Sequence, residues 1–139
     1  MCIDKNTDIL VVDDSEDNLL LMQLVFEIQG CNIRKAQLGN NGIHEVHQAR
    51  PDLIILDLMM PDMSGFEFMR YLKNNGLSDI PIILLTANAY VDKQEAYDAY
   101  DVCYKPIDLD NLLSRVELLL PCPNACGVKT STTAIIDIG

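Results

Sequence analysis

Three runs of four consecutive apolar residues, at 9–12, 53–56 and 82–85, are the strongest pattern along the chain. Residues that are apolar at successive positions are buried on both faces, which is typical of central strands in a parallel sheet that helices cover on both sides. A strand with one exposed face would instead alternate apolar and polar residues. Two shorter segments, 32–36 and 102–104, complete a predicted set of five strands.

Between the strands, apolar residues recur every three or four positions, which is the spacing of one face of a helix. Ser15 is a suitable N-cap for the first helix, and Pro51 and Pro121 follow the second and the last, because proline cannot continue a helix. We interpret residues 39–42, Gly-Asn-Asn-Gly, as a turn. The five predicted helices cover residues 16–29, 43–49, 65–74, 91–99 and 109–120.

Strands and helices alternate throughout, so the pattern predicts an α/β fold, a three-layer α/β/α domain around a five-stranded parallel sheet. The expected domain covers residues 8–120, after a short lead at 1–7. Residues 121–139 form a C-terminal tail, for which we expect either disorder or an extra strand. The residues of the first helix that we expect to face the core are Leu21, Leu24, Val25 and Ile28.

The composition favours one domain and argues against several kinds of partner. A chain of 139 residues suffices for one hydrophobic core, and a formal net charge of −11 disfavours nucleic acid, whose binding depends on Lys and Arg at phosphates. The N-terminus lacks the layout of a signal peptide and no apolar run reaches membrane-spanning length, so we expect a cytoplasmic protein without a membrane partner. Five cysteines, an odd number, suggest reduced thiols, with Cys31 and Cys103 as small core residues.

Polar residues follow the strands at their carboxyl ends: Asp13 and Asp14 after the first, Asp57 after the third, Thr86 after the fourth and Lys105 after the fifth. These ends meet at one edge of a parallel sheet, where α/β proteins bind ligands. Three nearby carboxylates repel, so the cluster requires raised pKa values or a cation such as Mg²⁺. Asp57 is then placed to accept a phosphoryl group whose oxygens Lys105 and Thr86 contact. A turn at Asp57 and a helix cap at Asp13 or Asp14 are the alternatives, although one cap explains only one of the adjacent acids.

His44 and His47 lie three positions apart in the second helix and form a weaker candidate for a metal site. No further ligand at suitable spacing supports them, and the segment HEVH is one residue shorter than the HExxH motif of zinc proteases. We therefore interpret both histidines as part of a solvated helix face.

Taken together, these segments resemble the receiver domain of two-component response regulators. The matching residues are the pair Asp13 and Asp14 after ILVV, Asp57 within DLMMPDMSG, Thr86 within LLTA, and Lys105 before a proline. The resemblance runs in order from about Asp8 to Leu120. It implies a flavodoxin-like sheet with strand order 2-1-3-4-5.

The resemblance also implies roles for single residues. Asp57 would be the phosphoacceptor. Asp14 and Asp57 would bind Mg²⁺ directly, together with the backbone carbonyl of Met59, and Asp13 would act through water.

At the last two strands the resemblance implies a phosphate-responsive switch. The hydroxyl of Thr86 would move toward the phosphoryl group, and Lys105 would pair with it. Where the family usually has a switch aromatic, three residues before the lysine, this chain has Val102. Tyr100 and Tyr104 flank that position and are candidates for its role, and the segment between Thr86 and Lys105 is shorter than is usual in the family.

The implied function is that of a single-domain regulator that takes a phosphoryl group from a histidine kinase or histidine phosphotransfer protein, with Mg²⁺ as cofactor. Its output would be a changed affinity for a downstream protein, because no output domain fits after Leu120. It would not be an enzyme beyond catalysing its own phosphorylation and dephosphorylation. The alternatives are a pseudo-receiver, which binds partners without phosphate turnover, and an aspartate-nucleophile, Mg²⁺-dependent phosphatase. The phosphatase motif is D-x-D, whereas Asp57 is followed by Leu58 and Met59.

Overall fold

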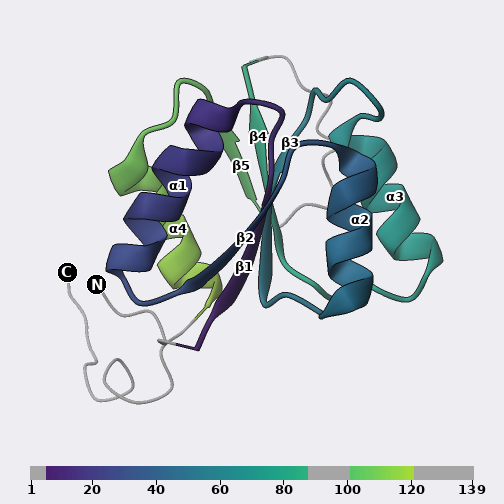
Figure 1. The fold of residues 1–139 in the computed structure, drawn as a ribbon, viewed down its shortest axis with the longest axis horizontal. Helices are drawn as coiled ribbons and strands as arrows, with labels where there is room; N and C mark the ends of the chain where they lie inside the picture. Colours follow the sequence, from purple (N-terminus) through teal and green to yellow (C-terminus); the bar gives the residue numbers. More distant parts are fainter. Residues whose placement is uncertain (1–5, 88–100, 121–139) are drawn as a thin grey trace.

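The computed structural model describes residues 6–87 and 101–120 and forms a parallel five-stranded sheet between two layers of helices (Figure 1). The strand order is β2-β1-β3-β4-β5, which confirms both the three-layer fold and the order 2-1-3-4-5. The predicted helix at 91–99 and the tail at 121–139 lie outside the described residues. The strands are β1 Asp8–Val12, β2 Asn32–Ala36, β3 Leu53–Asp57, β4 Ile82–Thr86 and β5 Asp101–Tyr104.

Helices cover both faces of the sheet (Figure 1). α1 (Glu16–Ile28) and α4 (Leu109–Leu119) pack on one face, while α2 (Gly39–Gln48) and α3 (Gly65–Asn74) pack on the other. Within the described part of the chain, no helix has the length and hydropathy of a membrane-spanning segment. Because helices pack on both faces of the sheet, each face needs its own apolar side chains.

The three consecutive apolar runs meet this need because successive side chains of a strand point to opposite faces. In β3, Ile55 belongs to the core under α1 and α4, whereas Ile54 belongs to the core under α2 and α3. All five residues of β3 and of β4 are buried. Cys31 and Cys103 are buried free thiols in the first of these cores, which agrees with their predicted role as small core residues.

The buried face of α1 differs from the prediction. Leu24 is 53% exposed and Ile28 is 81% exposed, Leu21 is also exposed, and Val25 is only partly buried. The helix has apolar residues on more than one face, so its spacing alone did not identify the side that meets the sheet. The side chains of α1 that are buried are Leu19, Met22 and Phe26.

The start of α2 also differs from the prediction. Residues 39–42, expected to form a turn, make the first turn of the helix, which begins at Gly39. Leu38 occupies the N-cap position and provides no side-chain hydrogen bond to the helix. Instead, the carboxylate of Asp62, from the loop between β3 and α3, accepts hydrogen bonds from the backbone N–H groups of Gly39 and Asn40. A cap from a distant segment thus replaces the local one that the sequence lacks.

Candidate functional site

Adjacent strands bring the predicted acids together. β1 pairs with β3 in a register that aligns Val12 with Leu56, so the residues that follow each of them lie side by side at the carboxyl edge. One carboxylate oxygen from each of Asp13, Asp14 and Asp57 lies within 4.8 Å of the others. Asp13 and Asp57 are buried, whereas Asp14 is exposed and leaves the cluster open on one side.

Asp13 is held by the start of α1. Its Oδ1 atom accepts a hydrogen bond of 2.9 Å from the backbone N–H of Ser15, and its Oδ2 atom accepts one of 3.3 Å from the side-chain amide of Asn18. The N–H of Asp13 donates to the carbonyl of Ala36 in β2. Because a fully buried carboxylate must be hydrogen-bonded or paired, these contacts explain how this acid is tolerated, and Asn18 is a contributor that the sequence reasoning missed.

Lys105 reaches the same edge from the end of β5, two strands away from β3. Its Nζ atom lies 3.3 Å from Asp57 Oδ1 and 3.5 Å from Asp13 Oδ2. The backbone N–H of Lys105 donates to the carbonyl of Thr86, which ties the residue to the end of β4. One ammonium group faces three carboxylates, so the cluster keeps an excess of negative charge.

The surroundings of Asp57 make its carboxylic acid weaker than usual. Burial first, and then the negative charge of Asp13, raise the pKa of Asp57 to about 6, against the opposing effect of Lys105 and of the Met59 N–H group. That N–H group lies 3.3 Å from Asp57 Oδ1. An ionised carboxylate is thus held in a place where it is costly, and a bound cation would relieve the cost.

The donor set fits Mg²⁺. Its carboxylate oxygens are hard ligands, they converge within 4.8 Å, and the exposed side at Asp14 leaves room for the waters that Mg²⁺ retains. Within residues 6–87 and 101–120, this is the cluster of acidic, His or Cys side chains that could hold a metal ion. His44 and His47 instead contact neighbouring side chains, Gln48 and Tyr71 respectively.

The predicted switch residues divide between the described and undescribed parts of the chain. Thr86 is buried at the end of β4, one residue beyond the partner of Asp57, and pairs in register with Tyr104. Val102 is partly buried against the core under α2 and α3, while Tyr104 is exposed. Tyr100 lies outside the described residues.

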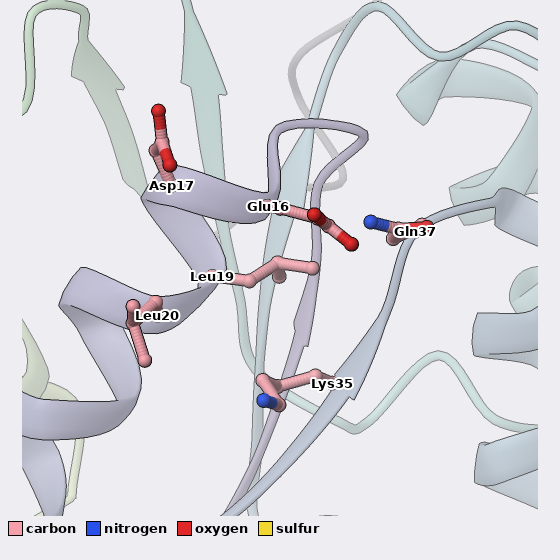
Figure 2. A pocket seen from close by; sticks show the side chains of 6 residues that line it. All are labelled: Glu16, Asp17, Leu19, Leu20, Lys35 and Gln37. Carbon is pink, nitrogen blue, oxygen red and sulfur yellow. The ribbon is translucent and has the colours of Figure 1, made fainter.

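A pocket of about 400 Å³ lies between the start of α1 and the edge strand β2 (Figure 2). Glu16 and Gln37 point toward each other at one end of it, and the side chain of Lys35 extends from β2 toward α1 (Figure 2). Leu19 and Leu20 line it from α1.

The protein is thus an α/β/α domain that gathers three acids and a lysine at the carboxyl edge of its parallel sheet. The family model described as the response regulator receiver domain matches residues 9–117. The chain belongs to this family, the receiver domains of two-component response regulators.

Curated relatives agree with this assignment. Protein PilH of Pseudomonas aeruginosa is 33% identical over 116 residues, which cover 81% of this chain and 96% of PilH. The DNA-binding dual master transcriptional regulator RpaA of Synechocystis is 36% identical over 116 residues, which cover 81% of this chain but only 48% of RpaA. The chain thus spans about half the length of the second relative.

Solved structures show the same fold. The chemotaxis protein CheY4 of Vibrio cholerae superimposes with a TM-score of 0.77 at 28% identity, covering 83% of this chain and 99% of CheY4. The response regulator TrrA of Thermotoga maritima, solved in complex with Mg(2+)-BeF, superimposes with a TM-score of 0.75 at 30% identity, covering 82% and 99% of the two chains.

Proposed function

We propose that this receiver domain accepts a phosphoryl group on Asp57 from a histidine kinase or a histidine phosphotransfer protein. The observation that carries the proposal is the buried Asp57 carboxylate, clustered with Asp13 and Asp14 and contacted by the ammonium group of Lys105. A pseudo-receiver has no need to retain a buried carboxylate at such electrostatic cost. The site thus favours turnover over binding alone.

The transfer uses few groups. An oxygen of Asp57 attacks the phosphorus of the donor phosphohistidine, the new O–P bond forms as the P–N bond breaks, and the imidazole nitrogen keeps the electron pair. Lys105 lies close enough to Asp57 to pair with a phosphoryl oxygen, and the hydroxyl of Thr86 lies at the same edge of the sheet. Asp13, Asp14, Asp57 and the carbonyl of Met59 would hold Mg²⁺, which neutralises charge on the phosphoryl oxygens when bound.

The outer face of α1 supports docking of a protein donor. Leu20, Leu24 and Ile28, spaced by four residues, are all exposed, and α1 begins directly after the acids of the site. An apolar stripe on a helix fits the apolar face of a partner helix. A donor helix that lies along this stripe can bring its phosphohistidine to the open side of the cluster at Asp14.

The proposed output is a change in binding to another protein. We propose that phosphorylation changes the surface around Thr86, Val102 and Tyr104, and so changes affinity for a downstream protein. We also propose that the protein acts in the cytoplasm, as a single domain, and catalyses only its own phosphorylation and dephosphorylation. The coverage of PilH supports a single domain, whereas the match to RpaA shows that related receivers occur within longer regulators. Hydrogen exchange with and without beryllofluoride, a phosphoryl mimic, would show which segments respond.

The decisive experiment is the intact mass of the protein before and after treatment with acetyl phosphate and Mg²⁺. We expect one added phosphoryl group in the wild type and none in Asp57→Asn. A protein that gains no mass would favour the pseudo-receiver, and steady turnover of a generic phosphate ester would favour the phosphatase. Equal labelling of the variant would show that Asp57 is not the acceptor.

A further inference from the structure

The loop between β3 and α3 is anchored to the start of α2. Asp62, in this loop, accepts hydrogen bonds at both carboxylate oxygens, 2.9 Å from the backbone nitrogen of Gly39 to Oδ1 and 2.8 Å from that of Asn40 to Oδ2. The first N–H groups of a helix have no partner within the helix, and its N-terminus carries partial positive charge. The carboxylate therefore satisfies the end of α2 in both respects.

The electrostatics agree with the geometry. Asp62 is exposed, and the small loss of hydration at the helix end raises its pKa, but hydrogen bonds from the N–H groups of Asn40 and Gly39 outweigh this and leave the pKa below its usual value. Asp62 is thus a stably ionised cap. Because Leu38 supplies no side-chain hydrogen bond, α2 depends on this cap from another segment.

Close packing accompanies the hydrogen bonds. A Cβ atom added to Gly39 would lie 2.3 Å from Cγ of Met63, so the loop and the helix end touch with no space between them. Two further contacts lie within this segment: Met59 forms a β-bridge with Ser64, and the N–H of Gly65 donates to the carbonyl of Leu58 at 2.7 Å. The N–H of Leu58 also donates to the carbonyl of Leu85, which ties the start of the loop to β4. Asp62 adds the contact that fixes the far part of the loop against α2.

The placement of the loop bears on the phosphorylation site because the same loop carries Met59. The N–H of Met59 lies 3.3 Å from Asp57 Oδ1, and its carbonyl is the backbone group expected to bind Mg²⁺. We propose that Asp62 is a positioning residue for this site: by fixing the loop to the N-terminus of α2, it holds the main chain of Met59 beside Asp57. This inference rests on the proposed function, in which that main chain takes part.

The test is calorimetric titration of the metal-free protein with Mg²⁺. Groups outside the ligand shell that orient ligands typically affect metal affinity by about 10-fold or more. We therefore expect Asp62→Ala to weaken Mg²⁺ binding by about 10-fold, and Asp62→Asn, which keeps one oxygen acceptor, to weaken it less. At low Mg²⁺ the rate of labelling by acetyl phosphate falls in the same order, and excess Mg²⁺ restores it.

Asp52 offers a matched control. It is also exposed, and its Oδ2 atom accepts a hydrogen bond of 2.9 Å from the backbone N–H of Asp8, but it precedes β3 and so lies at the opposite edge of the sheet. We expect Asp52→Ala to lower the melting temperature without changing Mg²⁺ affinity. A residue with a merely structural role would behave like this control.

Three results would overturn the inference: unchanged Mg²⁺ affinity in Asp62→Ala, equal loss in Asp52→Ala, or equal loss in Asp62→Ala and Asp62→Asn. The last would mean that charge alone, and not the hydrogen bonds, is responsible. If Asp62→Ala fails to fold, the comparison of Asp62→Asn with Asp52→Asn decides. Absence of labelling in the wild type would contradict the proposed function. The Mg²⁺ titrations would still show whether Asp62 affects Mg²⁺ affinity.

Discussion

Lys105 and Asp57 meet across a strand that separates them. Lys105 follows β5 and Asp57 ends β3, with β4 between, yet Nζ lies 3.3 Å from Asp57 Oδ1. The long side chain of lysine spans the gap and places its charge beside the Asp57 carboxylate. The same ammonium group also lies 3.5 Å from Oδ2 of Asp13.

This contact predicts a loss of transfer rate in Lys105→Met, which keeps the length of the side chain but removes its charge. Preorganised charges at a transfer site are worth about 100-fold in rate, so we expect labelling by acetyl phosphate to slow by about that factor. The rate is measured by intact mass over time at saturating Mg²⁺. Lys35→Met, in the pocket between α1 and β2, is the control and should label at the wild-type rate; slowing in both variants would contradict a specific role for Lys105.

The raised pKa of Asp57 predicts a pH-dependent gain in stability for Asp57→Asn in metal-free protein. The unfolded chain has an ordinary Asp pKa of about 4, and the folded protein has a pKa of about 6, so the folded state binds the proton more tightly. The resulting contribution to stability is complete below about pH 4 and is lost as the pH rises through about 6.

The variant has no such titration, so it should become more stable than the wild type as the pH rises. We expect a difference of up to about 3 kcal/mol in the free energy of unfolding near pH 7.5, shrinking toward about pH 4.5. Urea unfolding in EDTA across this range measures it. A difference that does not vary with pH would show that Asp57 is not destabilised by its surroundings.

The assignment of the metal site to the acidic cluster predicts that substitutions of two candidate ligands, Asp14 and His44, affect Mg²⁺ affinity differently. Asp14→Asn removes a hard anionic ligand, and we expect Mg²⁺ affinity to fall by about 10-fold or more. His44→Ala removes a side chain that contacts Gln48, and we expect affinity to be unchanged. Calorimetric titration of both variants checks this, and similar affinities would place the metal away from the acidic cluster.

The apolar stripe of α1 predicts that a substitution in it slows phosphotransfer from a protein donor but not from a small-molecule donor. We expect Leu20→Asn to slow phosphotransfer from a histidine kinase or phosphotransfer protein by about 10-fold, because it removes apolar contact area from the docking surface. Labelling by acetyl phosphate, which needs no docking, should not change.

The matched control is Leu118→Asn, which alters an exposed leucine near the end of α4, far along the helix from the site. It should leave both reactions unchanged. Equal slowing by the two donors in Leu20→Asn would mean that the substitution disturbs the site itself and that α1 is not the docking surface.

Much of the fold and of the site could be predicted from the sequence because the signals are local. A run such as 53–56 is apolar at every position, and only burial on both faces accounts for that, so β3 and its neighbours could be recognised one by one. The acids Asp13, Asp14 and Asp57 directly follow such strands, and parallel strands bring their carboxyl ends to one edge. The recognition of the receiver family followed from these same residues.

Tertiary structure alone decided what depends on contacts between distant segments. α1 has apolar residues on several faces, and only packing against the sheet selected Leu19, Met22 and Phe26 while leaving Leu24 and Ile28 exposed. The first turn of α2 looks like a turn in sequence because its cap, Asp62, is 23 residues away from Gly39. The approach of Lys105 to Asp57 likewise exists only once β3, β4 and β5 are assembled. The burial and the balance of charge that set the pKa of Asp57 depend on it too, since electrostatic energies depend on distance in space and not on separation along the chain.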